Sequence, residues 1–435
     1  MKTAAAISIG STIPAFTAKS YASIIGANER IGIGMMGVYS RGLALAKNFA
    51  ANKNARIISV SDVDSRASLK CIEAVEKVQN SKPEDIKDFR KALERKDLDA
   101  LVIAAPDHWH APAAILASAA GKHVYVEKPC SHNPNEGELL VQARNKYKNI
   151  IQMGNQRRSW PKIQAAITDL HNGVIGRPYF AKTWYTNNRA SIGQGKAAET
   201  PSWLDYDLWQ GPAPRKPYMD NLIHYNWHWF WHWGTGEALN NGVHMIDLAR
   251  WGLQVGHPTR VTSGGGRYRF QDDWETPDTQ VITLEFDNKS SITWEGRSCN
   301  NRPIEGSGVG VIFYGENGSL TIGSGNGYKV HDLDNKLVKE VKEDEDVQAT
   351  NLSGPADALD AIHIDNFLSA IGNGTRLNSD IAEGHISTLL CQLGNIAIRT
   401  GNTLNTNAAN GHIIDNKKAA ALWKREYQQG WAPKV

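Results

Sequence analysis

The sequence predicts an α/β protein with two domains: a doubly wound parallel sheet, then a domain with a large, mostly antiparallel open sheet. Three observations predict it. Strands and helices alternate from residue 30 to about residue 155, and short strands separated by turn pairs such as DN and NG dominate beyond Gly176. The 435 residues also exceed what one hydrophobic core usually organises.

The composition argues against several classes of partner. A net charge of +3 without a long basic block does not indicate nucleic acid. No run beyond the leader is long and apolar enough to span a membrane. The four cysteines lie far apart without a C-x-x-C pair, so we expect neither a zinc knuckle nor a disulfide framework.

Residues 1–29 read as a leader of small, mildly apolar residues with no acidic residue before Glu29. This favours an export signal and a periplasmic location, although Lys2 alone makes an incomplete twin-arginine signal. A disordered tail on a cytoplasmic protein is the alternative.

A glycine turn between the first strand and the first helix predicts a dinucleotide site. Ile31 to Met36 reads as a buried strand and Leu43 to Ala50 as the opening of a helix. The amino end of such a helix offers free N–H groups to a pyrophosphate. The G-x-G-x-x-G spacing has Tyr39 at its middle position, which implies a shifted pyrophosphate or a side chain turned outward. We expect the turn to contact the cofactor through Gly37, Tyr39, Ser40, Arg41 and Gly42.

An acidic residue follows the second strand, Ala55 to Val60. Asp62 lies 25 residues after Gly37, where a carboxylate accepts hydrogen bonds from the adenosine ribose. A 2′-phosphate would be repelled there, so NAD is preferred over NADP, with Arg41 or Arg66 as residues that would accommodate the phosphate. We therefore expect a Rossmann domain over residues 30–155.

Two further strands bring polar residues to the same sheet edge. Leu101 to Ala105 and His123 to Val126 flank an Ala-rich helix, and right-handed crossovers place the ends of parallel strands together. This edge is expected to carry Asp107 and the cofactor contacts Pro106, His108, His110, Glu127 and Lys128. Pro129 keeps Lys128 out of a helix, so its amine is free to reach inward.

Other elements complete this domain and begin the next. We expect helices over Pro83 to Arg95 and Pro134 to Tyr147, and a strand at Ile150 to Met153. The loop after that strand carries Asn155, Gln156 as a cofactor contact and Arg157 as a substrate contact.

The second domain is expected over residues 156–400, followed by a tail, residues 401–435, that packs on the body. Its predicted strands are Tyr179 to Tyr185, Arg260 to Phe270, Thr279 to Phe286, Ser291 to Arg297, Val309 to Tyr314 and Ser319 to Ile322. Two helices, Pro355 to Ile371 and Ser379 to Thr400, carry apolar residues at three- and four-residue spacing.

A polar helix face between Gly236 and Trp251 is the second catalytic candidate. Glu237, Asn240, His244 and Asp247 fall at steps of three and four. An imidazole suits proton transfer because its pKa lies near neutrality. A merely solvated helix face is the alternative.

Four tryptophans alternate from Trp227 to Trp233, with His228 and His232 between them. The pattern is typical of a strand with one aromatic face, or of a loop that offers flat surfaces to sugar rings. Packing in a core or subunit interface is the alternative. The histidines, including the pair His108 and His110, lack a hydrolytic zinc signature, so we expect no metal.

Taken together, the chain resembles the Gfo/Idh/MocA family of glucose-fructose oxidoreductase and inositol dehydrogenase relatives. The resemblance rests on IGIGMMGVYSRG, SDVD, AAPDHWH, VEKP and NNGVHMIDLARW, in the family's order. It implies a tightly held NAD(H) or NADP(H), polyol or sugar substrates, and a homo-oligomer, dimer or tetramer, formed through the open sheet. By matching position, Lys128 is the lysine between nicotinamide and substrate, before a cis proline.

The resemblance also implies the catalytic histidine. Family members commonly carry D-x-x-x-H, whereas this chain has Asn240 before His244. Because Asn cannot ionise, any carboxylate that supports His244 must be Glu237 or Asp247, or be absent.

We therefore expect an NAD(P)-dependent oxidoreductase acting on a secondary hydroxyl of a sugar, glycoside or cyclitol. Its acid/base is His244, assisted by Asn240, and Lys128 polarises the substrate oxygen. The expected substrate contacts are Lys128, Arg157, Tyr185, Trp227, His228, Glu237 and His244.

Two alternatives stay open. One is a glycoside hydrolase that recycles NAD through transient oxidation and elimination, with Tyr225, His228 or Tyr185 as a second base. The other is a non-catalytic sugar-binding protein, which Tyr39 and Asn240 favour.

Overall fold

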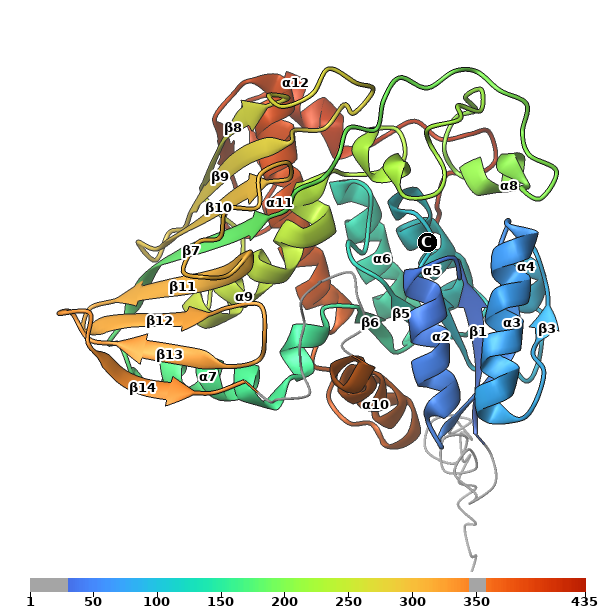
Figure 1. Ribbon diagram of the computed structural model, residues 1–435, viewed down its shortest axis with the longest axis horizontal. Coiled ribbons are helices and arrows are strands. Elements are labelled where there is room, and N and C mark those ends of the chain that lie inside the picture. The colour runs from blue at the N-terminus through green and yellow to red at the C-terminus, as the bar shows by residue number, and fades with distance from the viewer. Residues whose placement is uncertain (1–29, 344–356) are drawn as a thin grey trace, which may run out of the picture.

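The structure, a computed structural model, describes residues 30–343 and 357–435. The predicted leader, residues 1–29, lies outside the described residues. Two domains lie side by side, the first around a six-stranded sheet and the second around a ten-stranded sheet (Figure 1). Over the described ranges, no helix has the length and apolar character needed to cross a membrane.

The first sheet is parallel, with strand order β3-β2-β1-β4-β5-β6. Its strands are β1 (Ile31–Met36), β2 (Ala55–Ser61), β3 (Glu84–Asp85), β4 (Ala100–Ile103), β5 (His123–Val126) and β6 (Ile151–Met153). The main helices between them are α2 (Arg41–Ala51), α3 (Ser65–Gln79), α5 (Asp107–Ala119) and α6 (Pro134–Tyr147). The order reverses between β1 and β4, the point at which such sheets bind ligands.

One predicted helix of this domain is wrong. The segment Pro83 to Arg95 forms the short strand β3 and then the short helix α4 (Phe89–Ala92). The Asp88 side chain accepts a hydrogen bond from the Arg90 N–H (3.0 Å) and so starts α4 well after Pro83.

The second sheet has the order β14-β13-β12-β11-β7-β10-β9-β8-β15-β16. Only its β7–β10 pair is parallel, so the sheet is mostly antiparallel as predicted. Its strands are β7 (Pro178–Thr186), β8 (Arg260–Gly266), β9 (Thr279–Glu285), β10 (Ser291–Arg297), β11 (Val309–Gly315), β12 (Gly318–Ile322), β13 (Tyr328–His331), β14 (Leu337–Val341), β15 (Leu404–Thr406) and β16 (Ile413–Ile414).

Helices α7 (Pro161–His171), α9 (Val243–Leu253) and α11 (Ile381–Thr400) pack with this sheet. Helix α10 (Asp357–Asn373) instead packs on α2 of the first domain. Its side chains Ile364, Phe367 and Leu368 join the core of the first sheet. A helix late in the sequence thus completes the nucleotide-binding half; its predicted start, Pro355, lies outside the described residues.

Residues 187–235, which we call the strap, leave the second domain after β7 and cross over the first domain (Figure 1). They contain α8 (Tyr206–Gln210) and a 3-10 turn, Asn226–Trp229. The alternating tryptophans therefore do not form a strand. Successive aromatic rings turn to different neighbours because the backbone coils at this point.

The C-terminal residues return to the first domain. After α12 (Lys417–Ala420), Trp431 packs edge-on against Trp109 of α5, with ring centroids 5.3 Å apart. The chain ends near α5 in Figure 1. This segment contacts the strap, where the Gln428 N–H donates a hydrogen bond to Pro212 O (3.0 Å).

Candidate active site

A pocket lies at the carboxyl ends of β1, β2, β4 and β5, roofed by the strap. The first domain lines it with the glycine turn, the ends of β2 and β4, and the Glu127–Lys128 pair. The strap and the helix start beyond it contribute Leu208, Trp209, His224, Tyr225, Trp227, His228 and Asn240. The predicted sheet edge thus faces an enclosed site built from both domains.

The glycine turn is shaped for a phosphate group. Gly37 has φ +78°, and a Cβ there would lie 2.7 Å from the Ala105 backbone. A Cβ on Gly42 would meet Gly37 O at 1.8 Å, so Gly42 supports the turn from behind and does not line the pocket. The Ser40 side chain makes no capping hydrogen bond to α2, so the amino end of this helix is open toward the pocket.

Tyr39, at the position of the missing middle glycine, lines the pocket, and its side chain is turned outward to the strap. The ring is 53% exposed and stacks on His224 of the strap, with centroids 3.9 Å apart. The His224 Nε2 lies 2.9 Å from the Asp64 carboxylate. Tyr39 therefore links the glycine turn to the strap through its contact with His224.

Asp62 lies at the expected end of β2 and lines the pocket. Its carboxylate accepts hydrogen bonds from the Val38 N–H (2.6 Å) and the Asp64 N–H (2.8 Å). Burial raises the pKa of Asp62, against the effect of these two bonds. The carboxylate is thus fixed beside the glycine turn.

The two arginines considered for a 2′-phosphate are bound elsewhere. Arg66 pairs with Asp64 (2.8 Å) and lies over the Trp203 ring. Arg41 lines the pocket but bridges Glu127 (2.8 Å) and Asp360 (2.5 Å). Each guanidinium already has a carboxylate partner.

Lys128 follows strand β5 and precedes Pro129, to which it is joined by a cis peptide bond. Its side chain reaches into the pocket. Its Nζ donates to the Asn240 carbonyl (2.5 Å) and to Asn240 Oδ1 (3.3 Å). Burial lowers the pKa of Lys128, while the carboxylates of Glu127 and Asp107 act in the opposite direction. The amine is thus nearer to releasing its proton than an exposed lysine.

The two histidines of the PDHWH segment have different surroundings. His110 lines the pocket, and its ring nitrogens lie 2.6 Å from the carbonyls of Pro129 and Ala105. His108 faces the strap, with Nε2 2.9 Å from Trp209 O and Nδ1 3.3 Å from Trp233 O. The structure does not bring His108 to the pocket; its ring bonds instead to the strap, in the middle at Trp209 and near the end at Trp233.

The predicted polar face around His244 is interrupted by a π-helical turn, Ala238–Gly242, which precedes α9. Glu237 turns to Arg189 (2.7 Å) and Asp247 turns to Arg158 (2.8 Å). Neither carboxylate therefore supports His244. The sequence left open support from Glu237, support from Asp247, or no carboxylate support. The structure shows no direct carboxylate support for His244 among the described residues.

His244 itself is buried and does not line the pocket. Among the described residues, neither of its ring nitrogens has a hydrogen-bond partner. Burial, and next the nearby Lys128 charge, lower the pKa of His244 well below its usual value. The ring is a neutral imidazole whose two nitrogens have no partner among the described residues.

Two of the predicted substrate residues meet at the pocket wall. The rings of Trp227 and His228 stack with centroids 3.6 Å apart. His228 Nδ1 lies 2.5 Å from the Tyr225 carbonyl, which only accepts, so Nδ1 carries the hydrogen and Nε2 keeps its lone pair. Burial lowers the pKa of His228 to about 3.

Three other predicted substrate residues do not line the pocket. The Arg157 guanidinium donates to the carbonyls of Ser324 (2.6 Å) and Gly325 (3.1 Å). The Tyr185 hydroxyl accepts from Asn187 Nδ2 (2.7 Å), and Glu237 lies against Arg189. These groups surround the site rather than face it.

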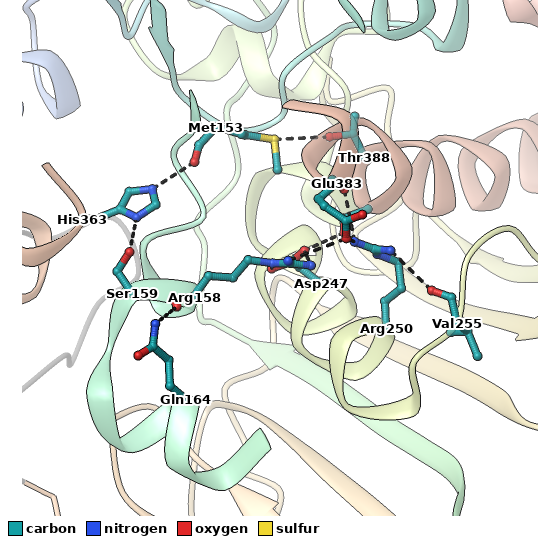
Figure 2. A network of polar contacts seen from close by, with 11 residues as sticks. Met153, Arg158, Ser159, Gln164, Asp247, Arg250, Val255, His363, Glu383 and Thr388 are labelled. Carbon is teal, nitrogen blue, oxygen red and sulfur yellow. Dashed lines mark hydrogen bonds and ion pairs between the residues drawn. The ribbon is translucent and has the colours of Figure 1, made fainter. Parts of the chain in front are cut away.

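A buried polar network joins the loop after β6 to α9, α10 and α11 (Figure 2). Arg158 makes two bonds to Asp247 (2.8 and 2.9 Å), and Arg250 pairs with Glu383 (2.5 Å). His363 lies between Ser159 Oγ (2.6 Å) and Met153 O (3.0 Å). The loop that carries Gln156, which lines the pocket, is thus fixed to the helix that carries His244.

Sequence reasoning did not assign several residues that the structure places at the site. Asp107, Trp109, Leu208, Trp209 and His224 line the pocket. Asp107 follows a strand end and carried a signal. Asn155, which the sequence did offer as a contact, is buried without lining the pocket, and both its amide atoms lack partners among the described residues. The strap residues carried none, because their contacts join segments far apart in the chain. No group of three metal-ligating side chains occurs in the part of the chain that the structure describes.

Fold and site together define a dinucleotide-binding α/β protein with a buried amine at the carboxyl edge of its sheet. The family model described as "Oxidoreductase family, NAD-binding Rossmann fold" matches residues 31–155, and "Oxidoreductase family, C-terminal alpha/beta domain" matches residues 169–406. The chain belongs to the Gfo/Idh/MocA oxidoreductase family, as the motifs indicated. Its first domain is the NAD-binding domain of that family, and the open glycine turn fits the cofactor.

Curated relatives and a solved structure extend this comparison. The chain is 29% identical to the "Glycosyl hydrolase family 109 protein" of Saccharopolyspora erythraea over 45% of each chain. It is 29% identical to the "Glycosyl hydrolase family 109 protein 2" of Shewanella sp. ANA-3, over 82% of this chain and 80% of the relative. A structure of levoglucosan dehydrogenase with NADH and levoglucosan shares the fold with a TM-score of 0.67 at 18% identity, covering 87% of this chain and 99% of that one.

Proposed function

We propose that the protein uses bound NAD to oxidise a secondary hydroxyl of a sugar, glycoside or cyclitol. The observation that carries this proposal is the Lys128 amine, which projects into the pocket and bonds there only to Asn240 among the described residues. A substrate oxygen can replace either of those bonds. NAD, when bound, accepts the hydride from the carbinol carbon.

Four residues of this chain are assigned the other catalytic and binding roles. The Lys128 ammonium stabilises the developing charge on the substrate oxygen. His244 is our candidate base, because a neutral ring with two unpartnered nitrogens accepts a hydroxyl proton. The Nε2 lone pair of His228, in the pocket wall, is a second acceptor. Trp227 offers a flat apolar surface to the sugar ring.

We propose NAD rather than NADP as the working cofactor. The ribose lies beside Asp62 in this assignment, and the carboxylate repels a 2′-phosphate. Arg41 and Arg66 do not offset the repulsion, because both are paired with other carboxylates.

A second candidate, redox-neutral glycoside cleavage, is favoured by the strap. Its backbone is bonded to the first domain at Ser65 N–Trp203 O (3.1 Å) and Asp205 N–Val63 O (3.0 Å), and its Tyr225 and His228 line the pocket. A cofactor held under such a roof suits oxidation, elimination, water addition and re-reduction on one NAD. Two relatives carry a glycosyl hydrolase name.

Two further proposals concern the whole molecule. We propose that the protein is exported, on the leader sequence, and that it forms a dimer or tetramer through the second sheet. On β10 the half-exposed Thr293 and Glu295 alternate with the buried Ile292 and Trp294, which leaves one sheet face open. Cell fractionation and light scattering test these two points.

The enzymatic test uses purified protein, a panel of aryl glycosides and free sugars, with and without added NAD. Reduced-nicotinamide absorbance and aglycone release are followed together. Net reduction supports the dehydrogenase, and aglycone release without net reduction supports the glycosidase. If neither signal is seen, the result supports a non-catalytic sugar-binding protein. Lys128→Met is the inactive control.

A further inference from the structure

Asn240 occupies the position of the aspartate in the D-x-x-x-H pattern, and its amide is oriented by its neighbours. The Asn240 Oδ1 faces the Lys128 amine (3.3 Å), and Asn240 Nδ2 lies 3.3 Å from Glu237 Oε1. A carboxylate oxygen only accepts and an ammonium only donates, so the amide has one orientation that satisfies both. Glu237 therefore determines which end of Asn240 Lys128 meets.

Glu237 is buried and fully occupied. Its carboxylate accepts from Arg189 Nε (2.7 Å), from Ser298 Oγ (3.1 Å) and from the Asn241 amide. A buried carboxylate of this kind is stable only while its cationic partner is in place.

Arg189 is that partner, and its own position is fixed from several sides. Its Nη1 donates to the Tyr225 hydroxyl (2.6 Å), and its guanidinium lies 4.8 Å from the Trp229 ring centroid. Arg189 and Tyr225 both belong to the strap, and the roof of the pocket is thereby joined to Glu237. Burial opposes the charge, yet Glu237 keeps the pKa of Arg189 above its ordinary value.

We propose that Arg189 is a positioning residue of the candidate active site, which acts through Glu237 and Asn240 to set the orientation and charge environment of the Lys128 amine. This inference rests on the proposed function only for the catalytic role that it gives to the Lys128 amine. No motif pointed to Arg189, and among the described residues no bond joins it to Lys128 or His244.

The expected charge effect has a clear sign. The charged groups that act on Lys128 are Glu127, Asp107, Arg41 and Glu237, and the titratable rings of His228 and His244 also interact with its charge. With Arg189 removed, Glu237 is left as an unbalanced carboxylate, which favours the Lys128 ammonium and raises its pKa. With Glu237 made neutral, Arg189 is left as an unbalanced cation and lowers it.

The test measures the amine directly. The full chain, as purified, is labelled with trace acetic anhydride between pH 6 and 11, and acetylation of Lys128 is read by mass spectrometry. Arg189→Met should move the labelling midpoint to higher pH, with about tenfold less labelling at a fixed pH below it. Glu237→Gln should move the midpoint lower, and the double variant should return it close to the wild-type value.

A matched control is available on β10, where Arg297 and Glu295 form an ion pair of 2.9 Å. Arg297→Met and Glu295→Gln should leave Lys128 labelling unchanged. A wild-type midpoint in either single variant of the Arg189–Glu237 pair overturns the proposal. Should Arg189→Met fail to fold, Glu237→Gln and the double variant still decide it. Labelling requires no turnover, so a failure to oxidise sugars would not affect the result.

Discussion

Replacing Asp62 by Asn should relax the choice between NAD and NADP. The Asp62 carboxylate is fixed by the Val38 and Asp64 N–H groups beside the glycine turn, and no free arginine faces it among the described pocket residues. A 2′-phosphate charge about 4 Å from this carboxylate, at an effective dielectric constant of about 20, is disfavoured by about 4 kcal/mol. The wild type should therefore bind NADH on the order of 10³ more tightly than NADPH.

The assay is titration of tryptophan fluorescence with NADH and with NADPH. In Asp62→Asn the ratio of the two Kd values should fall from about 10³ to about one, because the repulsion that produces the preference is lost. The amide accepts from only one of the two N–H groups, so absolute affinity and stability should fall as well; the ratio cancels this effect. Asp88→Asn, at the start of α4, should leave the ratio unchanged. An unchanged ratio in Asp62→Asn, or similar binding of NADH and NADPH by the wild type, refutes the reasoning.

Three further predictions follow from the site and its supports. Lys128→Met and His244→Ala should each slow reduction of bound NAD by about 10²–10⁴ in single-turnover absorbance, while the amount of bound NAD stays at the wild-type level. A chain ending at Lys424 lacks the bonds of Arg425 to Glu136 and His108 O (both 2.8 Å), which support the strap. It should release NAD about tenfold faster than the full chain in a dilution-and-trap assay. Equal release rates would contradict a role for this segment. Asp247→Asn should cost about 3–5 kcal/mol of unfolding free energy in urea at pH 7. Because Arg158 holds the pKa of Asp247 below its ordinary value against the effect of burial, this difference should shrink as the pH falls below about 4, and a constant difference would contradict it.

The sequence predicted the sheet edge well because local signals place it. Glu127 and Lys128 follow a buried strand and precede a proline, and Asp62 follows another strand at a spacing typical of dinucleotide sites. Backbone periodicity and handedness are enough to bring these residues together. The same logic predicted most strands of the second sheet to within a few residues.

The strap could not be predicted, because its contacts are long-range. The His108 ring bonds to carbonyls 101 and 125 residues later, and no residue type marks a carbonyl as an acceptor. The π-helical turn before α9 was also invisible, since a step of three or four residues assumes regular helix. One extra residue in that turn displaces Glu237 relative to His244, whereas Asp247 lies in the same regular helix as His244 and pairs with Arg158.

The most direct test of the central claim is a crystal structure of the protein with NADH and a bound sugar. The account predicts the nicotinamide ring between the glycine turn and Lys128, with one sugar hydroxyl within hydrogen-bond distance of both the Lys128 amine and the His244 ring. A sugar bound elsewhere, with Lys128 still bonded to Asn240 and both His244 nitrogens still unpartnered, would contradict it.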